Sequence, residues 1–285
     1  MAEQQRFTAL DSTVIDQARR KRLDTIVLRR DRSWLRKLSG NPAALLQRMA
    51  RHGALVPLGG GRYAIAEIGA RSSAMSTTWQ VVLDADLSPL GPYYLGFMSA
   101  LEDHRLTDLD EPDITVAIGF HNDRLERGRE TIFRRPLRIT TMQPKAFASG
   151  IETVHQSRNR RYRRSDVERT LVDCHERPRL VASVEVWIRA WARALREERV
   201  NVDRLLEHSQ RQGVSAMRRT AVLLSLLGYG VEARETFRGR ARRADRVVPF
   251  IAGRDVPTGA DVDSYWRVAW NIPSETIEGW LAYER

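Results

Sequence analysis

The chain has 285 residues, which is long enough for two domains that each have a core. No apolar run approaches the ~20 residues of a membrane span, and the first twenty residues lack the layout of a signal peptide. The single cysteine, Cys174, excludes an internal disulfide and a cysteine-based zinc site. We therefore expect a cytoplasmic protein.

The formal net charge is +11, and it is unevenly distributed. Residues 1–70 hold 13 Lys and Arg against 6 Asp and Glu, whereas residues 71–285 hold 34 against 30. Arginine is enriched everywhere and lysine occurs only at Lys21, Lys37 and Lys145. A GC-rich coding sequence could therefore account for the high isoelectric point. It does not account for the concentration of charge in the first quarter, which is typical of a protein that binds a polyanion.

Two elements are expected before residue 30. Residues 11–23 predict a helix, because Val14, Ile15 and Ala18 lie on one side of it. Residues 25–28 (TIVL) form a short β-type run, which could pair with a later hairpin.

The most informative stretch is residues 31–65, which reads as helix, turn, helix and hairpin. The turn contains Asn41, which can cap the second helix through its side-chain oxygen, and Pro42, which suits the first helical position. Apolar residues then recur at helical spacing, at Leu45, Leu46, Met49 and Ala50. Residues 54–57 and 62–65 flank three glycines, which predicts a hairpin with a flexible tip.

This order of elements predicts a winged helix-turn-helix over residues 1–68. In that motif the second helix enters the major groove and the wing contacts the DNA backbone or the minor groove. Two helices and a hairpin also occur in many domains with no role in DNA binding. If the domain binds DNA, the second helix directs Gln47, Arg48 and Arg51 at the bases, with Arg36 and Asn41 near phosphates and Arg62 on the wing.

Residues 69–78 are small and polar and predict a linker to a larger second domain, residues 79–285. The first part of this domain predicts two helices, over residues 79–87 and 93–106, and a small sheet, with strands at residues 114–118, 137–141 and 151–154.

An arginine cluster follows the expected sheet. Five of the seven residues 158–164 (RNRRYRR) are arginine, and they are candidate phosphate contacts: Arg158, Arg160, Arg161, Arg163 and Arg164. A solvated edge strand or turn that carries protective charges explains the cluster equally well. A second cluster of five arginines lies in residues 237–246.

The remainder predicts a helical bundle. Residues 165–168 (SDVE) form a capping-box pattern, and Cys174 on the following helix is expected to be a small core residue. Residues 184–195 predict a strongly amphipathic helix whose two tryptophans face the core. Further helices are expected at residues 203–210, 215–227 and from 273, with strand-like runs at 247–251 and 265–270. The fold class is therefore α+β, with a mixed α/β second domain that includes a helical bundle portion.

Few patterns point to catalysis. Gly59-Gly60-Gly61 is followed by Arg62 and is no phosphate-binding loop, and the six histidines form no metal-spaced pair. Pro112-Asp113 before a strand matches half of a metal-nuclease signature, but the second half, an acidic residue one position before a lysine, is missing. We expect no enzyme activity, no metal and no cofactor.

The second domain resembles the AbiEi-type antitoxins, which belong to bacterial toxin–antitoxin pairs whose toxin is a nucleotidyltransferase. The resemblance is carried by three stretches in this order: YLGFMSALEDHRLTD (residues 94–108), SDVERTLVD (165–173) and YWRVAWNIP (265–273). Together with the N-terminal domain, it covers nearly the whole chain. Arg105 departs from it, because many members have glycine there, and so does Ala182-Ser183, where a glycine pair is common.

The resemblance implies an antitoxin that binds inverted repeats in double-stranded DNA upstream of its own operon and represses that operon. It also implies that the second domain counteracts the toxin, directly or indirectly, without a catalytic site. A winged-helix regulator without an antitoxin role, or a module whose basic clusters grip an acidic protein, would share many of the same sequence features.

Overall fold

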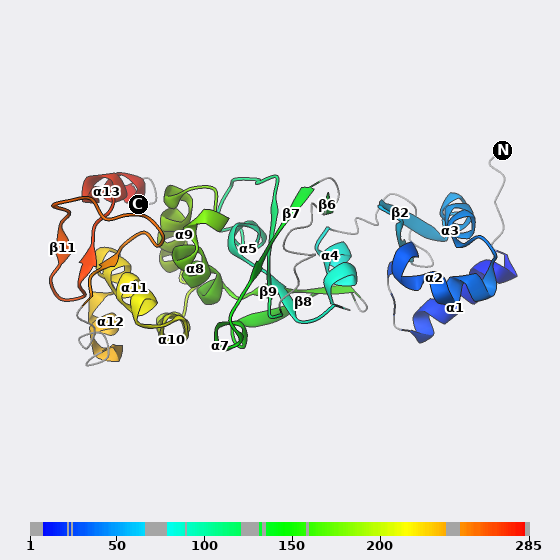
Figure 1. Ribbon diagram of the computed structural model, residues 1–285, viewed down its shortest axis with the longest axis horizontal. Helices are drawn as coiled ribbons and strands as arrows, with labels where there is room; N and C mark the ends of the chain where they lie inside the picture. Colours follow the sequence, from blue (N-terminus) through cyan, green and yellow to red (C-terminus); the bar gives the residue numbers. More distant parts are fainter. Residues whose placement is uncertain are drawn as a thin grey trace. The chain divides into compact units, whose positions relative to one another are not determined.

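The computed structural model describes residues 8–21, 23, 25–65, 79–88, 90–120, 131–132, 135–157, 160–237 and 246–282. The fold is mixed α+β, as predicted (Figure 1). The chain divides into two compact units: Met1–Pro92 with Glu130–Arg135 and Thr153–Tyr162, and Tyr93–Arg129 with Pro136–Glu152 and Arg163–Arg285. The predicted linker, residues 69–78, lies outside the described residues, so the predicted domain boundary stays a prediction. No described helix is long and apolar enough to cross a bilayer.

The N-terminal body, which we define as residues 8–65, has the predicted order of elements. They are α1 (Ala9–Arg20), β1 (Thr25–Val27), α2 (Leu28–Leu38), α3 (Pro42–Arg51), β2 (Leu55–Gly59) and β3 (Arg62–Ile65). The strands form an antiparallel sheet in the order β1-β3-β2, so the early strand pairs with the hairpin as expected. The strand was predicted to include Leu28, which is wrong: Leu28 begins α2, where the Asp31 carboxylate accepts the Val27 N–H at 2.8 Å.

One apolar core holds this body together. Its fully buried members come from α1, β1, α2, α3 and the strand after α3, and include Val14, Ile26, Leu35, Leu46 and Met49. Each such side chain is worth roughly 1.5–3 kcal/mol relative to an exposed one. The helices and the sheet therefore depend on one another for stability.

The central sheet has six strands in the order β6-β7-β5-β4-β9-β8. Their bounds are β4 (Tyr93–Leu95), β5 (Ile114–Ile118), β6 (Thr131–Ile132), β7 (Arg135–Thr141), β8 (Ile151–Ser157) and β9 (Arg160–Ser165). Strand β4 pairs antiparallel with β5 and parallel with β9, and β5 pairs parallel with β7. The predicted strands at residues 114–118, 137–141 and 151–154 are confirmed.

Two sequence interpretations are corrected here. Residues 93–106 were expected to be one helix, but β4 is followed by α5 (Phe97–Asp103), with φ of +54° at Phe97 separating them. All three residues of β4 are buried between two partner strands, which explains an apolar run without a polar side. The arginine-rich β9 is not the suggested edge strand, since it lies between β4 and β8.

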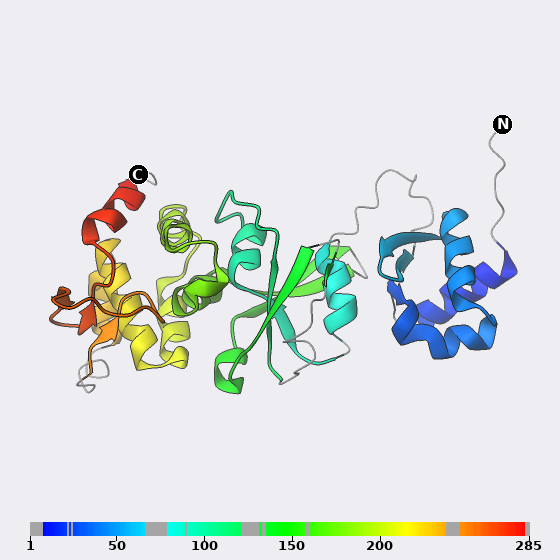
Figure 2. The same cartoon turned by 45° about the horizontal axis from the view of Figure 1, so that its top comes forward.

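The C-terminal part is mainly helical. Its elements are α8 (Val167–Glu176), η1 (Pro178–Leu180), α9 (Val184–Arg196), α10 (Val202–Gln212), α11 (Val214–Leu226), α12 (Gly230–Thr236) and α13 (Ser274–Ala282). A small sheet adds β10 (Val248–Pro249), β12 (Val268–Ala269) and β11 (Val262–Asp263) in that order, and the predicted helix α4 (Trp79–Leu87) and a short α7 (Pro144–Phe147) complete the fold. Helix α8 contacts α5, α9, α10 and α11 and is the centre of the bundle (Figures 1 and 2).

Most of the predicted helices are confirmed, with local corrections. Asp166, and not Ser165, caps α8, because its carboxylate accepts the Arg169 N–H at 2.7 Å. Helix α12 was missed after Gly228, and the expected strand at 265–270 is limited to Val268–Ala269, because a turn with φ of +56° at Arg267 precedes it. Cys174 is buried, as expected for a core residue.

His175 on α8 lies fully buried among aromatic rings. It stacks on Trp187 with 4.6 Å between ring centroids and also contacts Trp191 and Phe250. Burial, together with the positive charge of Arg219, lowers the pKa of His175 to about 3. The imidazole is therefore neutral in the folded protein at neutral and mildly acidic pH.

This predicts acid sensitivity with a defined window. The unfolded state, with a histidine pKa of about 6.5, takes up the proton first as the pH falls. Stability is then full above about pH 6.5 and is lost progressively down to about pH 3, by up to ~1.4 kcal/mol per pH unit. His175→Phe should flatten the dependence of the unfolding free energy on pH between 7 and 4.5, measured by urea titration. His155→Asn, which changes an exposed side chain of β8, is the control. Equal slopes for His175→Phe and the wild type would contradict this assignment.

Candidate nucleic-acid interface

Helix α3 is held in place by its cap and its apolar side. The Asn41 side chain accepts the Ala44 N–H at 3.1 Å, and Pro42 stands in the first turn. Leu45, Leu46 and Met49 are buried against the core. Because a helix turns every 3.6 residues, the outer side is left to the exposed residues Ala44, Gln47 and Arg51.

Arg48 has a different environment from its neighbours. Its Nη2 donates to Asp11 Oδ1 at 3.0 Å, and the Asp11 side chain is fully buried. Burial raises the pKa of Asp11, but hydrogen bonds from Thr8 and Arg48 outweigh it and lower that pKa overall. Since Asp11 also caps α1 through the Thr8 backbone N–H, Arg48 fastens α3 to the start of α1.

Helix α2 carries a group of exposed basic residues. Its exposed basic residues recur at helical spacing. Within the described part of the chain, no carboxylate lies in ion-pair distance of any of them, and the same holds for Arg51 on α3. The basic residues of this α2 group are Arg29, Arg32, Arg36 and Lys37.

The tip of the β2–β3 hairpin places Arg62 against a carboxylate. Gly60 and Gly61 have φ of +56° and +74°, which glycine adopts without strain. Arg62 Nε then donates to Asp86 Oδ2 of α4 at 2.6 Å. The predicted wing residue is thus paired and largely buried in this structure.

The arginines of residues 158–164 do not form one group. Arg158 lies outside the described residues, and the side chain of Arg160 is likewise not described. Arg161 is exposed and Arg163 is half-buried. Arg164 is bound to two carboxylates, with Nη1 2.6 Å from Asp103 Oδ2 and Nε 2.6 Å from Glu152 Oε1, so its guanidinium has a structural role. Of the second cluster, residues 238–245 also lie outside the described residues.

The sequence reading missed a buried polar network around Arg169 of α8. Arg169 Nε lies 2.8 Å from Asp173 Oδ2, and Arg169 Nη2 donates to the Tyr94 hydroxyl at 2.7 Å, which itself donates to Asp173. Gln212 supplies a donor to the second oxygen of Asp173, and Arg169 Nη1 donates to the Ser149 carbonyl. All of the strong acceptors are occupied by protein groups, which indicates a structural network.

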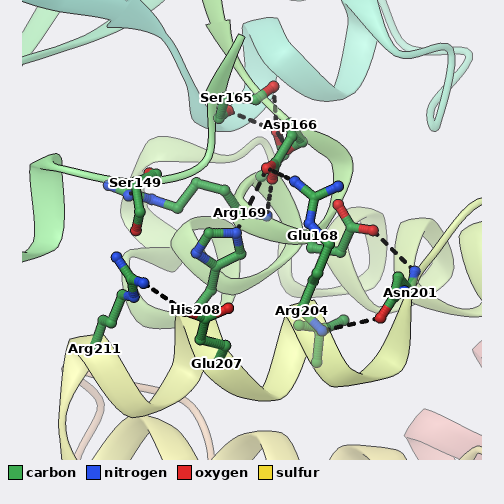
Figure 3. A network of polar contacts seen from close by, with 12 residues as sticks. Ser149, Ser165, Asp166, Glu168, Arg169, Asn201, Arg204, Glu207, His208 and Arg211 are labelled. Atoms are coloured by element: carbon green, nitrogen blue, oxygen red, sulfur yellow. Dashed lines mark hydrogen bonds and ion pairs between the residues drawn. The ribbon is translucent and has the colours of Figure 1, made fainter.

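Asp166 extends this network toward the surface (Figure 3). Its carboxylate lies between Arg204 and His208 of α10, with Oδ2 2.5 Å from Arg204 Nη2 and 3.5 Å from His208 Nε2. Gly150 has φ of +70°, and a Cβ there would lie 2.6 Å from the His208 ring. In the sequence, this cluster corresponds to the SDVERTLVD stretch. Its Asp166 accepts the Arg169 N–H, and its Arg169 pairs with Asp173.

Comparisons with known proteins add one finding. No protein-family model matches the chain, and no curated protein matches it. The structure is similar to the crystal structure of the Rv2827c protein from Mycobacterium tuberculosis, with a TM-score of 0.55 and 14% sequence identity over 92% of each chain. At this identity, the likeness concerns the fold alone.

Because Arg48 is paired and Arg51 is exposed, alanine substitutions of the two residues should differ in their effect on stability. Arg48→Ala removes a donor from a buried carboxylate, and we expect it to cost about 1–2 kcal/mol. Arg51→Ala changes an exposed side chain and should stay within about 0.5 kcal/mol. Hydrogen exchange of the α1 and α3 amides in the full chain measures both effects. Equal protection in the two variants would show that the Arg48–Asp11 contact does not hold α3 in place.

Proposed function

We propose that the N-terminal body is a winged helix-turn-helix that binds operator DNA, and that the protein is an antitoxin and autorepressor of the AbiEi type. The observation that carries the DNA-binding part is the outer side of α3. It presents Gln47 and also Arg51, which has no described ion-pair partner. Beside them lie the basic residues of α2, which likewise have no described ion-pair partner. A polyanion is the partner that would compensate these charges.

The residues of α3 differ in their proposed roles. Arg51 suits the O6 and N7 acceptors of guanine, Gln47 suits adenine, and the Ala44 methyl can contact the methyl group of thymine. Arg48 acts through Asp11 as a positioning residue, which revises its proposed role as a base reader. Arg36 and its neighbours on α2, and Asn41 at the start of α3, would lie near phosphates.

The antitoxin part rests on the family resemblance, with some structural support. Arg105, which departs from the glycine of many members, has φ of +57°, a conformation that favours glycine. Tyr94 and Arg169, from two of the resembling stretches, are in direct hydrogen-bond contact. We propose a non-enzymatic, cytoplasmic protein that counteracts a nucleotidyltransferase toxin, directly or indirectly. The check is whether the neighbouring gene encodes such a toxin and whether co-expression relieves its toxicity.

The DNA-binding proposal is tested by a gel shift on the inverted repeats upstream of the operon. Arg51→Ala and Gln47→Ala should each weaken operator binding by roughly 1–3 kcal/mol and relax specificity at one position, because each removes a base contact. Arg254→Ala, an exposed arginine of the C-terminal part, is the control. If all three variants bind as the wild type does, α3 is not in the groove.

The second candidate is a protein-binding module, because the unpaired arginines of α2 also suit an acidic protein surface. A variant with Arg29→Ala, Arg32→Ala and Arg36→Ala distinguishes the two. If these residues contact phosphates, the variant should bind all DNA sequences less tightly and lose up to ~0.9 of the salt slope per contact. If these arginines bind a protein instead, DNA binding should be unchanged, and co-purification of the neighbouring gene product from nuclease-treated extract should be lost.

A further inference from the structure

The last turn of α4 accepts hydrogen bonds from two arginines of the N-terminal body. Arg30 Nη1 donates to the Ala85 carbonyl oxygen at 2.6 Å, and Arg62 Nε donates to Asp86 Oδ2 at 2.6 Å. All four residues belong to the same compact unit of the chain. We name these two adjacent contacts the α4 clasp.

The end of α4 resembles an anionic ligand in its chemistry. The last carbonyls of a helix have no partner within it, and they carry the negative end of the helix dipole. Helix α4 has no basic residue in its last turn to offset this, and it adds the Asp86 carboxylate. Guanidinium groups bind such oxygens much as they bind phosphate oxygens.

The two arginines differ in how they are held. Arg30 also donates to the Thr25 carbonyl and to Asp31, so it is anchored within the N-terminal body independently of α4. For Arg62, Asp86 is the described partner, and the pair is 17% and 15% exposed. A Cβ at Gly60 would collide with the Arg62 guanidinium, so Arg62 lies closely over the hairpin tip.

We propose that the α4 clasp is an autoinhibitory contact: the Asp86 carboxylate binds the Arg62 guanidinium where a DNA phosphate would otherwise bind it. This inference rests on the proposed DNA-binding function, in which Arg62 at the tip of the wing hairpin contacts the DNA. Both Nε and Nη2 of Arg62 contact Asp86, so this edge of the guanidinium cannot bind a DNA phosphate while the pair is formed. DNA must therefore displace Asp86, which lowers the affinity of the free protein for the operator.

The test is operator binding by the full chain with Asp86→Asn, measured over a range of salt concentrations. Releasing Arg62 should raise affinity about threefold to fivefold, the size expected for loss of one partly exposed ion pair. The salt slope should steepen by about one unit, because one more phosphate contact forms. Asp16→Asn, which removes the same charge from an exposed position on α1, is the matched control.

The proposal also predicts that the gain in affinity from Asp86→Asn requires Arg62. In an Arg62→Ala background, Asp86→Asn should have no effect on affinity beyond that of Asp16→Asn. Asp86→Ser is a second variant in case the amide forms a substitute hydrogen bond to Arg62.

Three outcomes would overturn the inference while the DNA-binding proposal stands: a gain no larger than that of Asp16→Asn, a gain that persists without Arg62, or a loss of affinity. A wild-type protein that does not bind the upstream repeats would instead overturn the proposed function, and the inference with it.

Discussion

The buried pair of Arg169 and Asp173 is the constraint on which the C-terminal part of the structure depends. Both side chains are removed from water, so each charge is tolerated only because its hydrogen-bond partners are in place. Those partners come from β4 through Tyr94, from the turn before β8 through Ser149 and from α10 through Gln212. The pair thereby fixes the central helix to the sheet and to its neighbouring helix in one arrangement, where apolar contacts alone would tolerate sliding.

The N-terminal body also contains a buried charge whose partners come from separate elements. Asp11 is fully buried, and Thr8 and Arg48 satisfy it from two different helices. This directs one guanidinium of α3 inward and leaves Gln47 and Arg51 outside. An arginine in a basic stretch of the sequence is therefore not necessarily available to bind a partner at the surface. Its role depends on whether a carboxylate from elsewhere in the chain reaches it, as also happens to Arg62 and Arg164.

Sequence reasoning succeeded where local chemistry decides the structure. The Asn41 cap, the glycine tip of the hairpin and the apolar spacing of α9 are all local signals, and each was found. It failed at β4, because a three-residue strand buried on both sides has no alternating pattern and is defined by partners far along the chain. The roles of Arg48 and Arg62 could not be predicted for the same reason, since Asp11 and Asp86 lie 37 and 24 positions away.

The pairing of β4 also bears on the order in which the chain can fold. Leu95 pairs with Val116 on one side and with Arg164 on the other, so the sheet cannot be completed until β9 has been synthesised. The described core of the N-terminal body, by contrast, is built from residues up to Ile65. A chain that emerges from the ribosome thus holds a finished N-terminal core while β4 still lacks its second partner strand, β9. During that interval one edge of β4 exposes backbone groups that β9 later pairs.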